Sequence, residues 1–232
     1  VKAPGVGAIG TSRDGELGVV VYNSADVNTT QEAVDVNVLF HGVDWSSMCN
    51  SSNCSYYLAQ YRLDNNNSNP YRVWAQQGSP AYPTGAQLAA MREEAEVAMS
   101  ISRVLPGTIG FEIAGLPLPA VHLLHVCGFE DGASAPSQVT GLMVRRTTSA
   151  GTAIVRWASV PERCVKTYEV LWAGPSGPGF ARVNNDTIFR VFAHAREGAA
   201  AEGCYKVRAV DYRGVAGPLS DEQCLGGSVQ LV

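Results

Sequence analysis

The chain has 232 residues, of which 46% are hydrophobic and 16% are charged, with a formal net charge of −4 at pH 7. This length suits one large domain or two small ones with ample material for packed cores, and the slightly acidic balance leaves no basic stripe for nucleic acid. No apolar run approaches the about 20 residues that a membrane helix needs, so we expect no membrane insertion.

Most of the sequence is typical of short strands separated by turns rich in Gly, Pro and Asn. The first set of expected strands lies at residues 5–10, 17–22, 33–40, 56–63, 109–113 and 121–127, and the second set at residues 139–145, 152–157, 167–172, 187–192 and 204–210. Regular strands between turn-rich pieces favour β-sandwiches.

One helix is expected after the first four strands. Thr84 and Gln87 have the spacing of a capping box, in which each side chain hydrogen-bonds the other residue's backbone amide. Leu88, Met91 and Ala95 then recur at helical spacing, which predicts an apolar face turned toward the core. The opposite face would expose Arg92, Glu93, Glu94 and Glu96 to solvent.

A small, polar segment that contains proline at residues 132–137 is typical of a domain boundary. After it, Tyr205, Val207 and Ala209 alternate with Lys206 and Arg208, which predicts a strand with one buried face. The pattern resembles a fibronectin type III strand with an inward corner tyrosine. We therefore predict an all-β chain: a β-sandwich with one inserted helix over residues 1–133, followed by a fibronectin type III or immunoglobulin-like β-sandwich over residues 134–232.

Cysteines and glycosylation sequons together indicate the secretory pathway. The chain has six cysteines, an even number, and its Asn-x-Ser/Thr acceptors are Asn28, Asn50, Asn53, Asn66 and Asn185. We expect N-glycans on these residues and an extracellular, cell-surface or lysosomal location. Because the sequence starts at Val1 without Met or a signal peptide, we interpret it as a mature chain or a processed fragment.

Several segments occur in a defined order through both expected domains. They are Val6-Gly7-Ala8-Ile9, Tyr61-Arg62-Leu63-Asp64-Asn65, Asn69-Pro70, Trp74, Gly78-Ser79-Pro80, Pro83-Thr84, Leu123-Leu124-His125-Val126-Cys127, Cys164, Thr167-Tyr168-Glu169 and Arg208-Ala209-Val210-Asp211-Tyr212. In this order they resemble the C-terminal half of α-L-iduronidase-like glycoside hydrolases of family 39. The part from Asn69 to Thr84 also resembles bacterial β-xylosidases of that family.

The resemblance implies a protein of three parts: a catalytic (β/α)8 barrel, a β-sandwich beside it and a fibronectin-like C-terminal domain. This chain corresponds to the last two parts. The family's acid and nucleophile glutamates lie in the barrel, so no residue of this chain inherits a catalytic role. The resemblance also implies a disulfide bond between Cys127 and Cys164 that would join the two domains.

The other cysteines are paired on simpler grounds. Cys49 and Cys54 flank a short Ser/Asn-rich loop, where a local bridge is plausible. Cys204 precedes the corner tyrosine and Cys224 follows the last strand, so elimination pairs these two.

The glutamates and histidines that could act in catalysis or bind a metal are interpreted as structural residues. Glu93, Glu94 and Glu96 crowd one wet helix face, whereas glycoside hydrolysis needs two carboxylates that flank one bond. His122 and His125 are three apart on a strand, so they point to opposite faces and do not converge on a metal.

The Asn-rich segment that starts at Asp64 and includes Asn66 is rich in oxygen ligands. It lacks the spaced carboxylates and closing Glu of a calcium loop, which favours a turn over a metal site. We therefore expect no metal and no cofactor. In an intact family member this loop would approach the barrel.

Three functions are compatible with these observations. The first is a non-catalytic region that supports a separate or cleaved-off catalytic barrel chain. The second is a stand-alone structural or adhesive glycoprotein that joins other extracellular protein subunits. The third is a carbohydrate-binding module.

Overall fold

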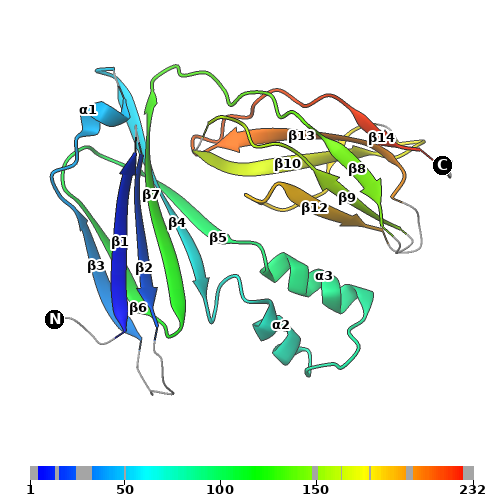
Figure 1. The fold of residues 1–232 in the computed structure, drawn as a ribbon, viewed down its shortest axis with the longest axis horizontal. Helices are drawn as coiled ribbons and strands as arrows, with labels where there is room; N and C mark the ends of the chain where they lie inside the picture. Colours follow the sequence, from blue (N-terminus) through cyan, green and yellow to red (C-terminus); the bar gives the residue numbers. More distant parts are fainter. Residues whose placement is uncertain are drawn as a thin grey trace. The chain divides into compact units, whose positions relative to one another are not determined.

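The computed structural model describes residues 5–13, 16–24, 33–49, 51–147, 151–162, 164–177, 179–196 and 201–226. The chain divides into two compact units, Val1–Ala133 (unit 1) and Ser134–Val232 (unit 2), and strands dominate both (Figure 1). The division falls inside the small, polar segment at residues 132–137. In the described ranges, no helix is long and apolar enough to cross a membrane.

Unit 1 is a β-sandwich with short helices in its connections. Its elements are β1 (Val6–Arg13), β2 (Glu16–Asn23), β3 (Val34–Phe40), α1 (Trp45–Met48), β4 (Cys54–Asp64), α2 (Pro70–Gln76), α3 (Gly85–Glu94), β5 (Ala98–Val104), β6 (Ile109–Leu116) and β7 (Ala120–Glu130). One antiparallel sheet has the order β1-β2-β7-β4-β5, and β3 pairs with β6 in a second sheet.

The core of unit 1 lies between these two sheets. Val21, Leu58 and Leu124 come from the larger sheet, and Val38 and Ile113 come from the smaller one. All five are at most 9% exposed, because alternate residues of each strand face the opposing sheet. β4 and β7 pair along their whole length, so that the end of β4 lies beside the start of β7.

The expected helix forms as α3, and its capping box is confirmed. The Gln87 amide donates to Thr84 Oγ1 at 3.3 Å, and the Thr84 amide donates to Gln87 Oε1 at 2.9 Å. The prediction of an inward apolar face is wrong, however, because no residue of α3 is buried and Leu88 is 40% exposed. The structure also adds α1 and α2, which the sequence pattern did not predict.

Unit 2 is a fibronectin type III-like β-sandwich. Its strands are β8 (Met143–Arg146), β9 (Thr152–Arg156), β10 (Val165–Ala173), β11 (Ala181–Arg182), β12 (Val191–Ala195), β13 (Gly203–Asp211) and β14 (Gln223–Leu225). One sheet has the order β12-β9-β8 and the other has the order β11-β10-β13-β14. The expected strand at 139–145 begins later, at β8, and the one at 187–192 begins at β12.

The corner tyrosine of unit 2 is confirmed. Tyr205 is fully buried, and its hydroxyl donates to the Ala201 carbonyl oxygen at 3.0 Å. That hydroxyl also lies 2.9 Å from Nδ1 of His194. Because its only hydrogen goes to Ala201, the tyrosine oxygen accepts from the Nδ1–H group of His194. Burial raises the pKa of Tyr205 to about 12.

Candidate functional site

Two buried polar side chains meet where β4 ends. Asp64 Oδ2 lies 2.9 Å from Nε2 of His122, and each side chain is 4% exposed. The other ring nitrogen of His122, Nδ1, lies 3.3 Å from Gln60 Nε2. An amide nitrogen can only donate, so Nδ1 accepts and the Nε2–H group donates to Asp64. Both ring nitrogens of His122 thus have a hydrogen-bond partner.

Asp64 also organises the Asn-rich loop that follows it. Its Oδ1 accepts from the backbone amides of Asn66 and Asn67 at 2.8 and 2.9 Å. Burial alone would raise the pKa of Asp64, but hydrogen bonds from His122, Asn67 and these two amides outweigh it and lower the pKa. N–H donors therefore surround both carboxylate oxygens, which favours a structural turn over a calcium site.

Ser68 closes the base of the insertion between β4 and β5. Its hydroxyl donates to the Arg62 carbonyl oxygen at 2.8 Å and accepts from the Ala98 amide at 2.8 Å. Arg62 and Ala98 are also the last paired residues of the two strands. The segment at residues 65–97 is thus an insertion whose two ends lie close together at the ends of β4 and β5.

This insertion is a helical hairpin of α2 and α3. Asn69 caps α2 by accepting from the Arg72 amide at 3.3 Å, and Pro70 occupies the first turn. Arg72 then forms a 2.9 Å ion pair with Glu94 of α3, and Trp74 Nε1 donates to the Pro80 carbonyl oxygen at 3.1 Å. The Asn69-Pro70 pair is a helix-start signal that sequence reasoning missed.

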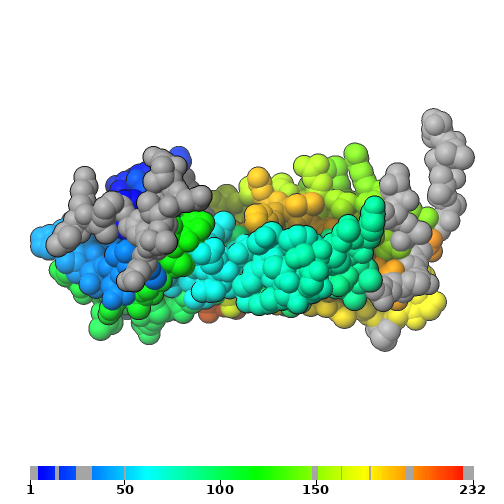
Figure 2. Space-filling view, turned by 90° about the horizontal axis from the view of Figure 1, so that it is seen from below, coloured from blue at the N-terminus to red at the C-terminus, as the bar shows by residue number. Residues whose placement is uncertain are grey.

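The hairpin exposes apolar side chains. Neither α2 nor α3 has a buried residue. Tyr71 is 68% exposed, Tyr82 is 94% exposed and Leu88 is 40% exposed. Figure 2 shows the hairpin, in turquoise, uncovered toward the viewer. A helix pair that buries so little of its own apolar surface has the character of an interaction surface.

The other candidates from the sequence stay apart. His125 lies 3.3 Å from Glu16 Oε2, whereas His122 contacts Asp64, so the two histidines have different partners. Within the described ranges, Cys204, Glu222 and Cys224 have atoms close enough to share a metal ion. The sulfur atoms of Cys204 and Cys224 are joined in a disulfide bond, so neither can act as a thiolate ligand.

Disulfide bonds staple both units locally. Cys49 is joined to Cys54, which links α1 to the start of β4. Cys204 is joined to Cys224, which links β13 to β14 at a position where these two residues are also strand partners. The pairing of Cys127 with Cys164 would join different units and stays a prediction.

The glycan acceptors that the structure describes are accessible. Asn53, Asn66 and Asn185 are exposed, as glycosylation requires. Asn66 lies in the loop that Asp64 organises. Asn28 and Asn50 fall outside the described residues.

Comparisons with known proteins agree with the fold. Residues 140–225 match the family described as the alpha-L-iduronidase C-terminal domain. Alpha-L-iduronidase of Mus musculus is 32% identical over 169 residues, which is 71% of this chain and 26% of that protein. The protein of Homo sapiens is 32% identical over 170 residues, which is 71% of this chain and 25% of that protein. The chain thus spans only about a quarter of the length of these relatives.

A solved structure extends the similarity in fold to almost the whole chain. It is that of a bacterial orthologue of human alpha-L-iduronidase, which is 24% identical to this chain with a TM-score of 0.73. The match covers 97% of this chain and 38% of the bacterial chain.

Proposed function

We propose that this chain, which corresponds to the C-terminal part of alpha-L-iduronidase-like proteins of glycoside hydrolase family 39, is non-catalytic and supports a catalytic (β/α)8 barrel. The barrel would be a separate chain or a cleaved-off part of the same protein. The observation that carries this proposal is the α2–α3 hairpin, whose helices have no buried residue and which exposes apolar side chains that the described residues of unit 1 leave uncovered.

The hairpin has the chemistry of a docking element. Tyr71 of α2, Leu88 of α3 and Tyr82 in the connection between the two helices are aromatic or aliphatic and exposed. Tyr is enriched among the residues that dominate binding energies, and fully burying a large apolar side chain contributes about 1.5–3 kcal/mol. Docking would therefore stabilise both the hairpin and the barrel flank that covers it.

Size-exclusion chromatography with light scattering, applied to material from the native source, tests the proposal. We expect the chain to co-elute with a chain that mass spectrometry identifies as a glycosidase barrel. Elution as a lone monomer contradicts support of a barrel, and a self-assembled particle would instead favour a structural glycoprotein. Glycoside cleavage by the purified chain alone would contradict its non-catalytic role.

Variants then locate the docking surface. Tyr71→Ser combined with Tyr82→Ser should weaken retention of the identified barrel chain at least tenfold, which is about 1.4 kcal/mol. Leu105→Ser is the matched control, because Leu105 is 80% exposed but follows the far end of β5 from the hairpin. If the double variant and the Leu105→Ser control lose the same amount of barrel binding, the docking surface lies elsewhere.

We further propose that the chain matures in the secretory pathway and works outside the cell or in lysosomes. The disulfide bonds within each unit and the exposed sequons at Asn53, Asn66 and Asn185 support this location. In that compartment Cys127 would pair with Cys164. Non-reducing peptide mapping tests this disulfide bond. A mass for the joined Cys127 and Cys164 peptides supports the pairing, and free thiols at these two residues contradict it.

A further inference from the structure

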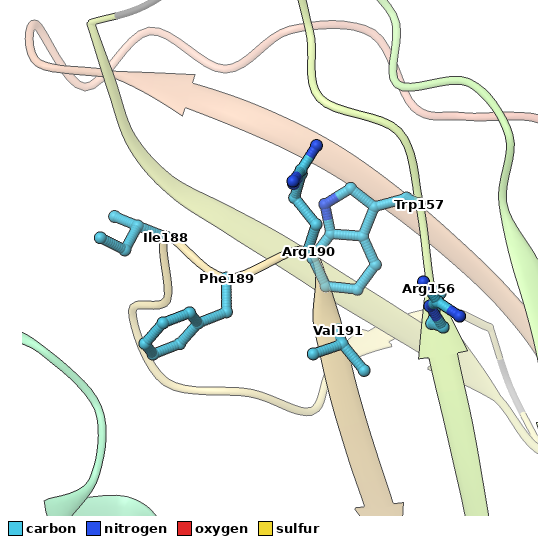
Figure 3. Close-up of a pocket in the computed structure, with 6 residues that line it drawn as sticks. All are labelled: Arg156, Trp157, Ile188, Phe189, Arg190 and Val191. Carbon is cyan, nitrogen blue, oxygen red and sulfur yellow. The ribbon is translucent and has the colours of Figure 1, made fainter.

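One end of the unit 2 sandwich holds a pocket that the support of a barrel does not explain. Its lining residues are Arg156, Trp157, Ile188, Phe189, Arg190 and Val191 (Figure 3). Val191, at the start of β12, pairs with Arg156, at the end of β9. The next residue, Trp157, donates its backbone amide to the Arg190 carbonyl oxygen at 3.2 Å. Two strand ends thus bring Arg156, Trp157 and Arg190 to the lining of one pocket.

The indole of Trp157 has an unsatisfied donor. The side chain is 5% exposed, and its buried Nε1–H group has no hydrogen-bond acceptor among the described residues. The indoles of Trp45, Trp74 and Trp172 each donate to a carbonyl oxygen at 3.1 Å. A buried donor without an acceptor is destabilising, so an acceptor that enters this pocket would be stabilised by pairing with the indole N–H group.

The charge of the pocket is positive. In the part of the chain that the structure describes, neither Arg156 nor Arg190 forms an ion pair, whereas Arg182 and Arg208 on the other sheet both pair with Glu169. None of the described residues that line the pocket is acidic. In Figure 3 the indole nitrogen lies on the side of the ring that faces the Arg190 side chain. An exposed Arg190 that swings slightly would admit an anion between its guanidinium and the indole.

The walls of the pocket select among anions. Ile188 is 37% exposed, Phe189 is 45% exposed and Val191 is 48% exposed. A sugar needs hydrogen-bond acceptors as well as donors for its hydroxyl groups, and the side chains here offer donors and apolar surface only. A carboxylate beside an aliphatic or aromatic group fits both features, because one oxygen can accept from the indole and the other from guanidinium.

We propose that this pocket binds the carboxylate of an Asp or Glu side chain that lies next to an apolar residue in a partner protein. The Trp157 indole N–H group and the Arg190 guanidinium hold the carboxylate, and Arg156 adds charge at the rim. Phe189, Ile188 and Val191 cover the neighbouring apolar side chain. This site lies in unit 2 and is independent of the α2–α3 hairpin of unit 1.

The resonance of the Trp157 Nε1–H group in a 15N–1H NMR spectrum tests this proposal on the whole chain, with Trp157→Phe used for assignment. The probe is the blocked dipeptide acetyl-Leu-Glu-amide, and acetyl-Leu-Gln-amide is its neutral counterpart. We expect a saturable downfield shift with the first peptide and none with the second. Arg190→Gln should weaken binding at least about tenfold, because it removes a hydrogen bond between two charged groups.

Arg145→Gln is the control, because it removes the same charge from the neighbouring strand β8 but lies outside the lining. It should leave the shift nearly unchanged. An equal response to both peptides, or an unchanged response in Arg190→Gln, overturns the proposal. Glucuronate is the second probe: if it shifts the same resonance at lower concentration than the peptide, the site is a uronate site and the assignment of a protein partner is wrong.

Discussion

Asp64→Asn should destabilise unit 1, because this carboxylate joins the end of β4, the Asn-rich loop and β7. The new amide nitrogen cannot accept, so the buried Nε2–H group of His122 or the Asn67 side chain loses its acceptor. The exposed backbone amide of Asn66 can turn to water instead. One or two unsatisfied buried donors cost about 1–3 kcal/mol each, so we expect the free energy of unfolding to fall by about 2–4 kcal/mol.

The effect should depend on pH in a defined direction. The folded pKa of Asp64 lies below the unfolded value of 3.8, so its stabilising contribution is complete above that value. The contribution is lost as the pH falls through the folded pKa, where the wild-type side chain also becomes neutral. The difference between wild type and Asp64→Asn should therefore stay nearly constant well above pH 3.8 and shrink as the pH falls below that value toward the folded pKa.

Hydrogen exchange in urea measures this change, because amides of β4 and β7 report on unit 1 separately from unit 2. Asp35→Asn is the matched control, because Asp35 is exposed. Among the described residues it accepts one hydrogen bond, from the Gly115 amide at 2.7 Å, and the loss of this bond should cost about 1 kcal/mol or less. Two results would refute the reasoning: equal protection in Asp64→Asn and wild type, or a difference that does not change with pH.

Burial, followed by the charge of Arg196, lowers the pKa of His194, so the unfolded chain binds a proton that the folded unit 2 does not. Thermal unfolding should therefore show stability that falls below pH 6.5, by at most about 1.4 kcal/mol per pH unit, and His194→Gln should flatten this dependence. Thr84→Ala removes the cap of α3 and should cost the hairpin about 0.5–2 kcal/mol, visible as faster exchange of α3 amides alone. Gly203→Ala should lower the stability of unit 2 by more than about 2 kcal/mol, because Gly203 has φ +131° and a Cβ there would clash with the Ala173 carbonyl oxygen. An unchanged melting temperature would contradict that clash.

The successful predictions depended on patterns among residues close together in the sequence. The Thr84 capping box depends on residues three apart, and the corner role of Tyr205 follows from alternation within one strand. β5 was missed although it pairs with β4, because its residues Ser100, Ser102 and Arg103 dilute the apolar alternation of an edge strand. The inward face expected for α3 failed because helical periodicity shows which residues share a face but not what covers that face.

The polar sites depend on residues far apart in the chain. Asp64 and His122 are 58 positions apart, and only the register of β4 with β7 brings them together. In the sequence, the run of asparagines after Asp64 favoured a turn over a metal site, but nothing in it showed that His122 is the partner of Asp64. Trp157 is buried, and its indole N–H group, which has no acceptor among the described residues, could not be recognised without the strand ends that surround it.

The closure of β4 against β5 at Ser68 has an evolutionary consequence. The hairpin leaves β4 and enters β5 at one position, which the hydrogen bonds of Ser68 fix. The length and composition of the hairpin can therefore change in evolution while β4 and β5 keep their register. Doubling a flexible connection costs only about 0.6 kcal/mol of closure entropy. Related proteins can therefore tailor this appendage to differently shaped neighbours without redesigning the sandwich that carries it.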